Sequence, residues 1–173
     1  MAAELPLSPL IAATTQWLTS AFPSARGAFQ RSLAEAQARQ AVTVAAWLRY
    51  PSEFDGQLVA LTGPGGAAKL DWITGADAHA HGNGREAWRT WVDEVVASWA
   101  ACLLSTPRLA EAAVLTVSGS AHSGPVPADF RRLARPGEDD RRAAALLRHP
   151  DLLAPIADLH RAELVDLLGG PEA

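Results

Sequence analysis

The sequence predicts an α+β domain in which a small, mainly antiparallel sheet of about three or four strands packs on a long central helix, with helices at both ends. Three observations favour this fold. They are a tryptophan-rich amphipathic segment at residues 83–104, alternating side chains on both sides of a Pro-Gly-Gly turn at 64–66, and helix stop signals near the termini. A chain of 173 residues fits a single domain, with residues 1–7 and 170–173 as frayed ends.

Two helices are predicted at the start of the chain. Ser8 followed by Pro9 is typical of a helix start, because serine can cap free backbone N–H groups and proline is tolerated in the first turn. This helix ends before Pro23. A second helix begins at Ser24, and Phe29 is expected on its buried side.

Strands are predicted in the middle of the chain. Residues 42–50 alternate and begin with β-branched side chains, which favours a strand, although the same residues could extend the preceding helix. Residues 56–63 and 67–75 flank the turn at 64–66 and predict a hairpin. Residues 113–118 have the length and β-branched content of a buried strand.

The central helix is predicted at residues 83–104. Asn83 can cap its first turn, Glu86 can complete a capping box, and Pro107 follows its end. Side chains at three-and-four spacing form one apolar stripe, which the sheet is expected to cover. The stripe consists of Trp88, Trp91, Val92, Val95, Val96, Trp99, Cys102 and Leu103. Further helices are predicted at residues 128–135, 138–148 and 155–168, where proline and glycine mark the boundaries.

Composition limits the classes of partner and the compartment. The net charge of −4 disfavours nucleic-acid binding, which needs a basic surface. The single cysteine, Cys102, cannot form an internal disulfide, and no signal peptide or membrane-spanning run is recognisable, so a cytoplasmic protein is expected. Lys69 is the only lysine beside many arginines and alanines, which is typical of a GC-rich bacterial genome.

The loop at residues 75–84 contains the strongest candidate for a metal site. Asp77, His79 and His81 alternate, so in an extended backbone their side chains point the same way and could hold zinc or another divalent metal. The segment resembles the Asp-x-His-x-His sequence of metal-dependent amidohydrolases, but their barrel of about 250 residues does not fit in this chain. His122 could supply a third nitrogen ligand, and a solvated polar loop remains the alternative.

Tryptophan and arginine side chains are the candidates for binding a partner. Trp88, Trp91 and Trp99 are assigned to the core, whereas tryptophans on the surrounding elements can mark an interface. The arginines of the C-terminal region predict either helical surfaces with ion pairs or a patch for an acidic partner. The predicted partner-binding residues are Trp17, Trp47, Trp72, Arg131, Arg132 and Arg135.

The sequence therefore predicts a non-catalytic protein–protein interaction module, such as an adaptor, a small chaperone or a structural subunit of an assembly. Its partner is another protein or a second copy of the chain, and no cofactor is expected. The alternative is a small metal-dependent enzyme with its site at Asp77, His79 and His81.

Overall fold

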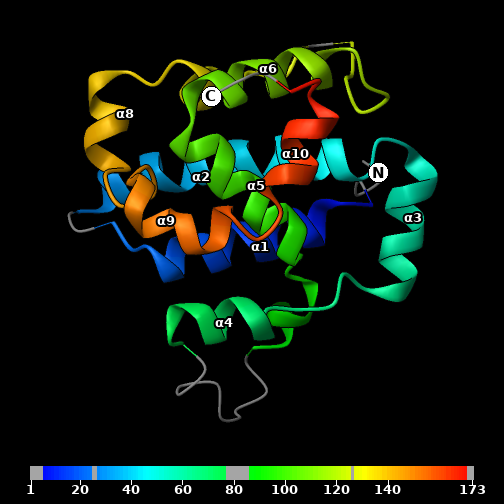
Figure 1. Cartoon of the computed structure of the whole chain (residues 1–173), viewed down its shortest axis with the longest axis horizontal. Coiled ribbons are helices and arrows are strands. Elements are labelled where there is room, and N and C mark those ends of the chain that lie inside the picture. Colours follow the sequence, from blue (N-terminus) through cyan, green and yellow to red (C-terminus); the bar gives the residue numbers. More distant parts are fainter. Residues whose placement is uncertain (1–5, 25–26, 77–85, 126, 171–173) are drawn as a thin grey trace.

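The computed structural model describes residues 6–24, 27–76, 86–125 and 127–170. Within these residues every regular element is a helix, so the predicted α+β fold is wrong (Figure 1). In chain order the elements are α1 (Ser8–Ala21), α2 (Ala28–Arg49), α3 (Glu53–Thr62), α4 (Ala68–Thr74), the 3₁₀ helix η2 (Ala87–Trp91), α5 (Glu94–Ser105), α6 (Pro107–Ser118), α7 (Arg131–Ala134), α8 (Glu138–Ala143), α9 (Pro150–Ala157) and α10 (Arg161–Leu167). The segments predicted as strands lie in α2, α3, α4 and α6.

The structure of α2 explains why residues 42–50 look like a strand in the sequence. This helix is 22 residues long and packs against α1, α5, α6, α7 and α8. Because neighbours cover it on several sides, its buried residues are not confined to one stripe, and Val44, Ala45 and Ala46 are all buried. The helical period is therefore lost from the hydrophobic pattern, and the remaining apolar run resembles a strand.

The predicted hairpin is a pair of helices, α3 and α4. Ser52 begins α3 with a capping box, in which its hydroxyl accepts from the backbone N–H of Asp55 (3.2 Å) and the Asp55 carboxylate accepts from the backbone N–H of Ser52 (3.1 Å). This motif signals the start of a helix, and the interpretation based on the glycine-rich turn overlooked it. Gly65 and Gly66 have positive φ and form part of a loop between the helices.

Residues 113–118 form the second half of α6 and are not a strand. The helix starts at Pro107 and continues for 12 residues. Its buried side chains, Leu109, Ala110, Ala113 and Val117, follow helical spacing. Packing against α2, α5 and α7 outweighs the strand preference of its β-branched residues.

Helix α5 is central, as predicted, but it starts later and helices surround it in place of a sheet. Residues 96–104 are all buried, and α5 packs against α2, α6 and α9 (Figure 1). Asp93 caps its first turn, because the Asp93 Oδ1 atom accepts from the backbone N–H of Val96 (2.9 Å). The extended Val92 separates α5 from η2, whereas the predicted cap Asn83 lies outside the described residues.

The terminal helices are confirmed, with different boundaries. Helix α1 starts at Ser8, although Leu7 and not Ser8 is the cap residue. Helix α2 begins at Ala28. Phe29 was predicted on its buried side but is exposed, and the buried side contains small residues such as Ala34 and Ala38. Residues 127–170 form four short helices, α7 to α10, where three were predicted, because the predicted helix at 155–168 is interrupted between α9 and α10. No helix in the described ranges is long and apolar enough to cross a bilayer.

A buried group of polar side chains fixes α4 and η2 against α1. The Asp71 carboxylate accepts from the indole N–H of Trp17 (2.9 Å), and both its oxygens accept from Arg89 Nη1 (2.8 and 2.9 Å). Asp71 and Trp17 are both almost fully buried. Three segments that are distant in sequence therefore meet at one carboxylate.

Candidate partner-binding surface

The outer side of α3 is an exposed apolar stripe. Phe54, Leu58 and Leu61 are 83%, 61% and 85% exposed. Their spacings of four and three residues place them on one face of the helix, and we call these three residues the α3 stripe. Gly56 and Val59, on the other side of α3, are buried. The helix therefore contacts the body through one face and presents large apolar side chains on the opposite face.

Local contacts hold α3 in this position. A Cβ atom at Gly56 would lie 3.1 Å from the Cβ atom of Pro6 and 3.6 Å from Leu7 Cγ, so glycine allows the close approach of α3 to the segment before α1. At the start of the helix, hydrogen bonds from the Ser52 hydroxyl and backbone N–H lower the pKa of Asp55, which strengthens the cap at neutral pH. The helix is thus formed before any partner binds.

Helix α3 lies at one end of the molecule (Figure 1). Its acidic residues are Glu53 and Asp55 in the first turn, and no Lys or Arg occurs within the helix. The α3 stripe therefore has an acidic border at the N-terminal end of the helix.

The predicted partner-binding tryptophans lie in three different environments. Trp72, on α4, is 72% exposed. Trp17 is 2% exposed and its indole N–H is bonded to Asp71, so it is a core residue. Trp47 is half-buried, stacked on His122 (ring centroids 5.5 Å apart) and in edge contact with Phe130 (5.6 Å). Of these three indoles, Trp72 alone is broadly open to a partner.

The three predicted arginines are also unequal. Arg131 is exposed, and Arg132 pairs with the largely buried Asp140 (Nη1 to Oδ1, 2.5 Å). Arg135 is strongly exposed and only 3.8 Å from Glu111, which is a weak surface pair. Arg132 thus belongs to an ion pair within the fold, whereas Arg131 and Arg135 lie on the surface.

The predicted metal site falls on Asp77, His79 and His81, which lie outside the described residues. The His122 Nε2 atom is 2.6 Å from the backbone oxygen of Tyr50. In the part of the chain that the structure describes, no three His, Cys, Asp or Glu side chains are grouped so that they could hold a metal ion. The metal site stays a prediction, which a zinc titration of protein purified without a histidine tag would test.

The interpretation as a hairpin missed the α3 stripe. Read as a strand, residues 56–63 place neighbouring side chains on opposite faces, so Leu58 and Leu61 fall on different sides. The signal that could have found the stripe is the Ser52–Asp55 cap followed by apolar residues at helical spacing.

Comparisons with protein-family models, with curated proteins and with solved structures found no match.

Proposed function

We propose that this chain is a protein-binding module that inserts α3 into an apolar groove of a partner protein. The observation that supports the proposal is the α3 stripe, three large apolar side chains more than 60% exposed on one face of a ten-residue helix. Single exposed apolar residues are common on soluble proteins, but a contiguous apolar surface is typical of an interaction site. Anchors at this helical spacing are those by which amphipathic helices bind grooves.

The size of the stripe favours a groove over a second copy of the chain. Even if each side chain buried the roughly 150 Å² of an aromatic residue, one copy would contribute at most roughly 450 Å². A specific interface buries about 800 Å² on each partner. Two convex helices meeting stripe to stripe would fall short of this area. A groove would also cover the flanks of α3 and add the missing contacts.

Charge defines the chemistry of the groove. Glu53 is exposed beside Phe54, and Asp55 lies one residue further along the same turn. Basic residues at the rim of the groove would pair with these carboxylates and would orient α3 in it. The partner is therefore a protein with an apolar groove and a basic rim at one end.

Photo-crosslinking tests the proposal. A photoreactive phenylalanine analogue replaces Leu58 in one variant and Leu115 in the control. Leu115 is matched because it is the one exposed leucine of α6, 77% exposed, whereas Leu109 on the same helix is buried. A protein crosslinked at position 58 and not at position 115 is then purified and titrated with the unmodified chain. The titration is repeated with Leu58→Asp and Leu115→Asp, after circular dichroism has verified that both variants are folded.

The proposal expects Leu58→Asp to weaken binding about tenfold or more, because a charge would enter the apolar groove. Leu115→Asp should leave the affinity within about twofold, since Leu115 lies on α6, outside the α3 stripe. Equal affinity of the two variants would refute the role of α3. A crosslinked product that consists of two copies of this chain would refute the partner groove and would show that the α3 stripe mediates self-association.

A further inference from the structure

A cationic cleft lies at the C-terminal end of α5. It shares no residue with the α3 stripe. Its volume is about 560 Å³, which is within the range of small-molecule sites. The lining contains three arginines and one histidine and no carboxylate, although the whole chain has a net charge of −4. The lining residues used below are Leu104, Pro107, Arg141, Arg148, His149 and Pro150.

Arg148 is anchored at the base of the cleft by neutral acceptors only. Its Nε atom donates to Gln37 Oε1 (2.7 Å), its Nη2 atom to the backbone oxygen of Arg132 (2.8 Å), and its Nη1 atom to that of Leu104 (3.3 Å). Burial lowers the pKa of Arg148 to about 10; nearby Asp140 raises it, and the neighbouring charge of Arg141 lowers it further. At neutral pH Arg148 is still a cation, fixed in place and poorly solvated.

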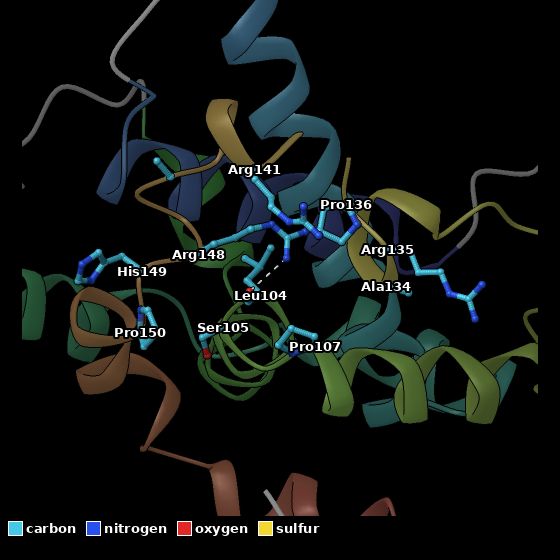
Figure 2. A pocket seen from close by; sticks show the side chains of 11 residues that line it. Leu104, Ser105, Pro107, Ala134, Arg135, Pro136, Arg141, Arg148, His149 and Pro150 are labelled. Carbon is cyan, nitrogen blue, oxygen red and sulfur yellow. Dashed lines mark hydrogen bonds between the residues drawn. The ribbon is translucent and has the colours of Figure 1, made fainter. Parts of the chain in front are cut away.

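Arg141 adds a second cation to the same place. Figure 2 shows Arg141 and Arg148 converging above Leu104, while the Arg135 side chain points away. In the described chain, neither Arg141 nor Arg148 forms an ion pair, whereas the nearby Arg142 pairs with Glu138 (2.7 Å). Two adjacent guanidinium groups repel each other, and a bound anion would remove this repulsion.

Two helix ends and several apolar side chains complete the cleft. Pro107 and Pro150 are the first residues of α6 and α9, so the positive ends of two helix dipoles lie at the lining, where Leu104 and Ser105 also bring the negative end of α5. Leu104 and the two prolines provide apolar surface beside the cations. The volume exceeds what a single phosphate group needs, so the cleft has room for an organic portion of the ligand.

We propose that this cleft binds a small organic phosphate, with the phosphate group between Arg141 and Arg148 and the organic portion against Leu104 and the prolines. Guanidinium N–H groups suit phosphate because they donate charge-assisted hydrogen bonds to its oxygens. The exposed Arg141 can donate two in parallel, whereas Arg148, whose Nε and Nη2 donors bond within the fold, offers one Nη1 N–H. Arg148 is held in advance by Gln37 and by the backbone, so little side-chain freedom is lost on binding. The proposal is independent of the α3 stripe and of the partner that binds it.

Calorimetric titration of the full chain at low salt tests the site with inorganic pyrophosphate, glucose 6-phosphate and citrate as probes. Arg141→Gln removes one cation from the cleft, and Arg141 is exposed, so the variant should fold. Arg31→Gln is the matched control, because Arg31 is an exposed arginine on α2 outside the cleft. Two-dimensional NMR of the arginine Nε–H groups reports on Arg148 without a substitution in the fold. The Arg148 Nε–H group donates to Gln37, so a phosphate bound at Nη1 would shift this resonance through the shared guanidinium group.

The proposal expects stoichiometric binding of glucose 6-phosphate, weakened about tenfold by Arg141→Gln and unchanged by Arg31→Gln, whereas binding of pyrophosphate alone would refute the organic portion of the ligand. The Nε–H resonance of Arg148 should shift on titration. Equal weakening by both substitutions would identify general attraction to a cationic surface and would refute the site. If millimolar glucose 6-phosphate produces no heat of binding and no shift of the Arg148 resonance, or if citrate alone binds, the assignment to organic phosphates is refuted.

Discussion

Replacing Asp71 with asparagine should destabilise the chain strongly, because one buried carboxylate joins α1, α4 and η2. Asp71 is 5% exposed and accepts hydrogen bonds from Trp17 and Arg89. Asparagine keeps nearly the same shape and one acceptor oxygen for the indole. It removes the charge that pairs with the guanidinium group and turns an amide N–H₂ group towards a cation.

The magnitude follows from burial. Breaking a buried ion pair by removing one partner costs about 3–5 kcal/mol. The Arg89 side chain is 24% exposed and also lies 2.9 Å from Glu86, which lowers the cost, and the retained bond to Trp17 lowers it again. We expect a loss of about 2–4 kcal/mol in the free energy of unfolding. In a chain of 173 residues this corresponds to a fall of roughly 5–15 °C in Tm.

Urea unfolding followed by circular dichroism measures this loss. The matched control is Glu138→Gln, which breaks an Arg142 pair of 2.7 Å between side chains that are 60% and 85% exposed. The control should lose no more than about 0.5 kcal/mol, because water screens the pair. If Asp71→Asn costs less than about 1 kcal/mol, or no more than the control, the structural role assigned to Asp71 is refuted.

Three further outcomes are expected. Ser98→Ala should destabilise the chain by about 1–3 kcal/mol in urea unfolding. The buried Ser98 hydroxyl donates to the backbone oxygen of Ala157 (3.0 Å) and accepts from the backbone N–H of His160, which precedes α10. The Cys102 thiol, whose pKa burial raises to about 11, should resist alkylation at pH 8 in the native chain and react once urea unfolds it. The Asp55 carboxyl should titrate below 3.8 by NMR and closer to 3.8 in Ser52→Ala, so the helix cap is lost as the pH falls through the lowered pKa. Unchanged titration in Ser52→Ala would exclude the Ser52 hydroxyl as the cause.

The prediction of the fold succeeded where a helix has one covered face and clear end signals. Helix α1, with Pro9 in its first turn, and the buried positions of Trp99 and Cys102 on the central helix are examples. It failed for α2, where helices on several sides removed the period, and for α3, where the glycine-rich loop outweighed the cap at Ser52. Local preference decides between helix and strand only when tertiary packing does not override it.

The candidate sites were less accessible to prediction than the helices. Trp72 was identified as a candidate for binding a partner and is exposed, but Trp17 has the same residue type and lies in the core. Composition alone does not distinguish them, because exposure depends on which distant residues cover a side chain. The adjacency of Arg148 and Leu104, which are separated by 44 positions, has no signature in either segment.

The sequence by itself determined the features that depend on neighbouring residues: a chain long enough for a domain, acidic in net charge, with helix starts at Ser8–Pro9 and in the Ser52–Asp55 cap. The tertiary structure alone decided that α3 shows its apolar stripe to solvent and that Arg141 and Arg148 converge in a cleft whose lining contains no carboxylate. The physical reason is that helix propensity and capping act within a turn of the chain. Burial and charge compensation depend on contacts between segments that only the folded packing brings together.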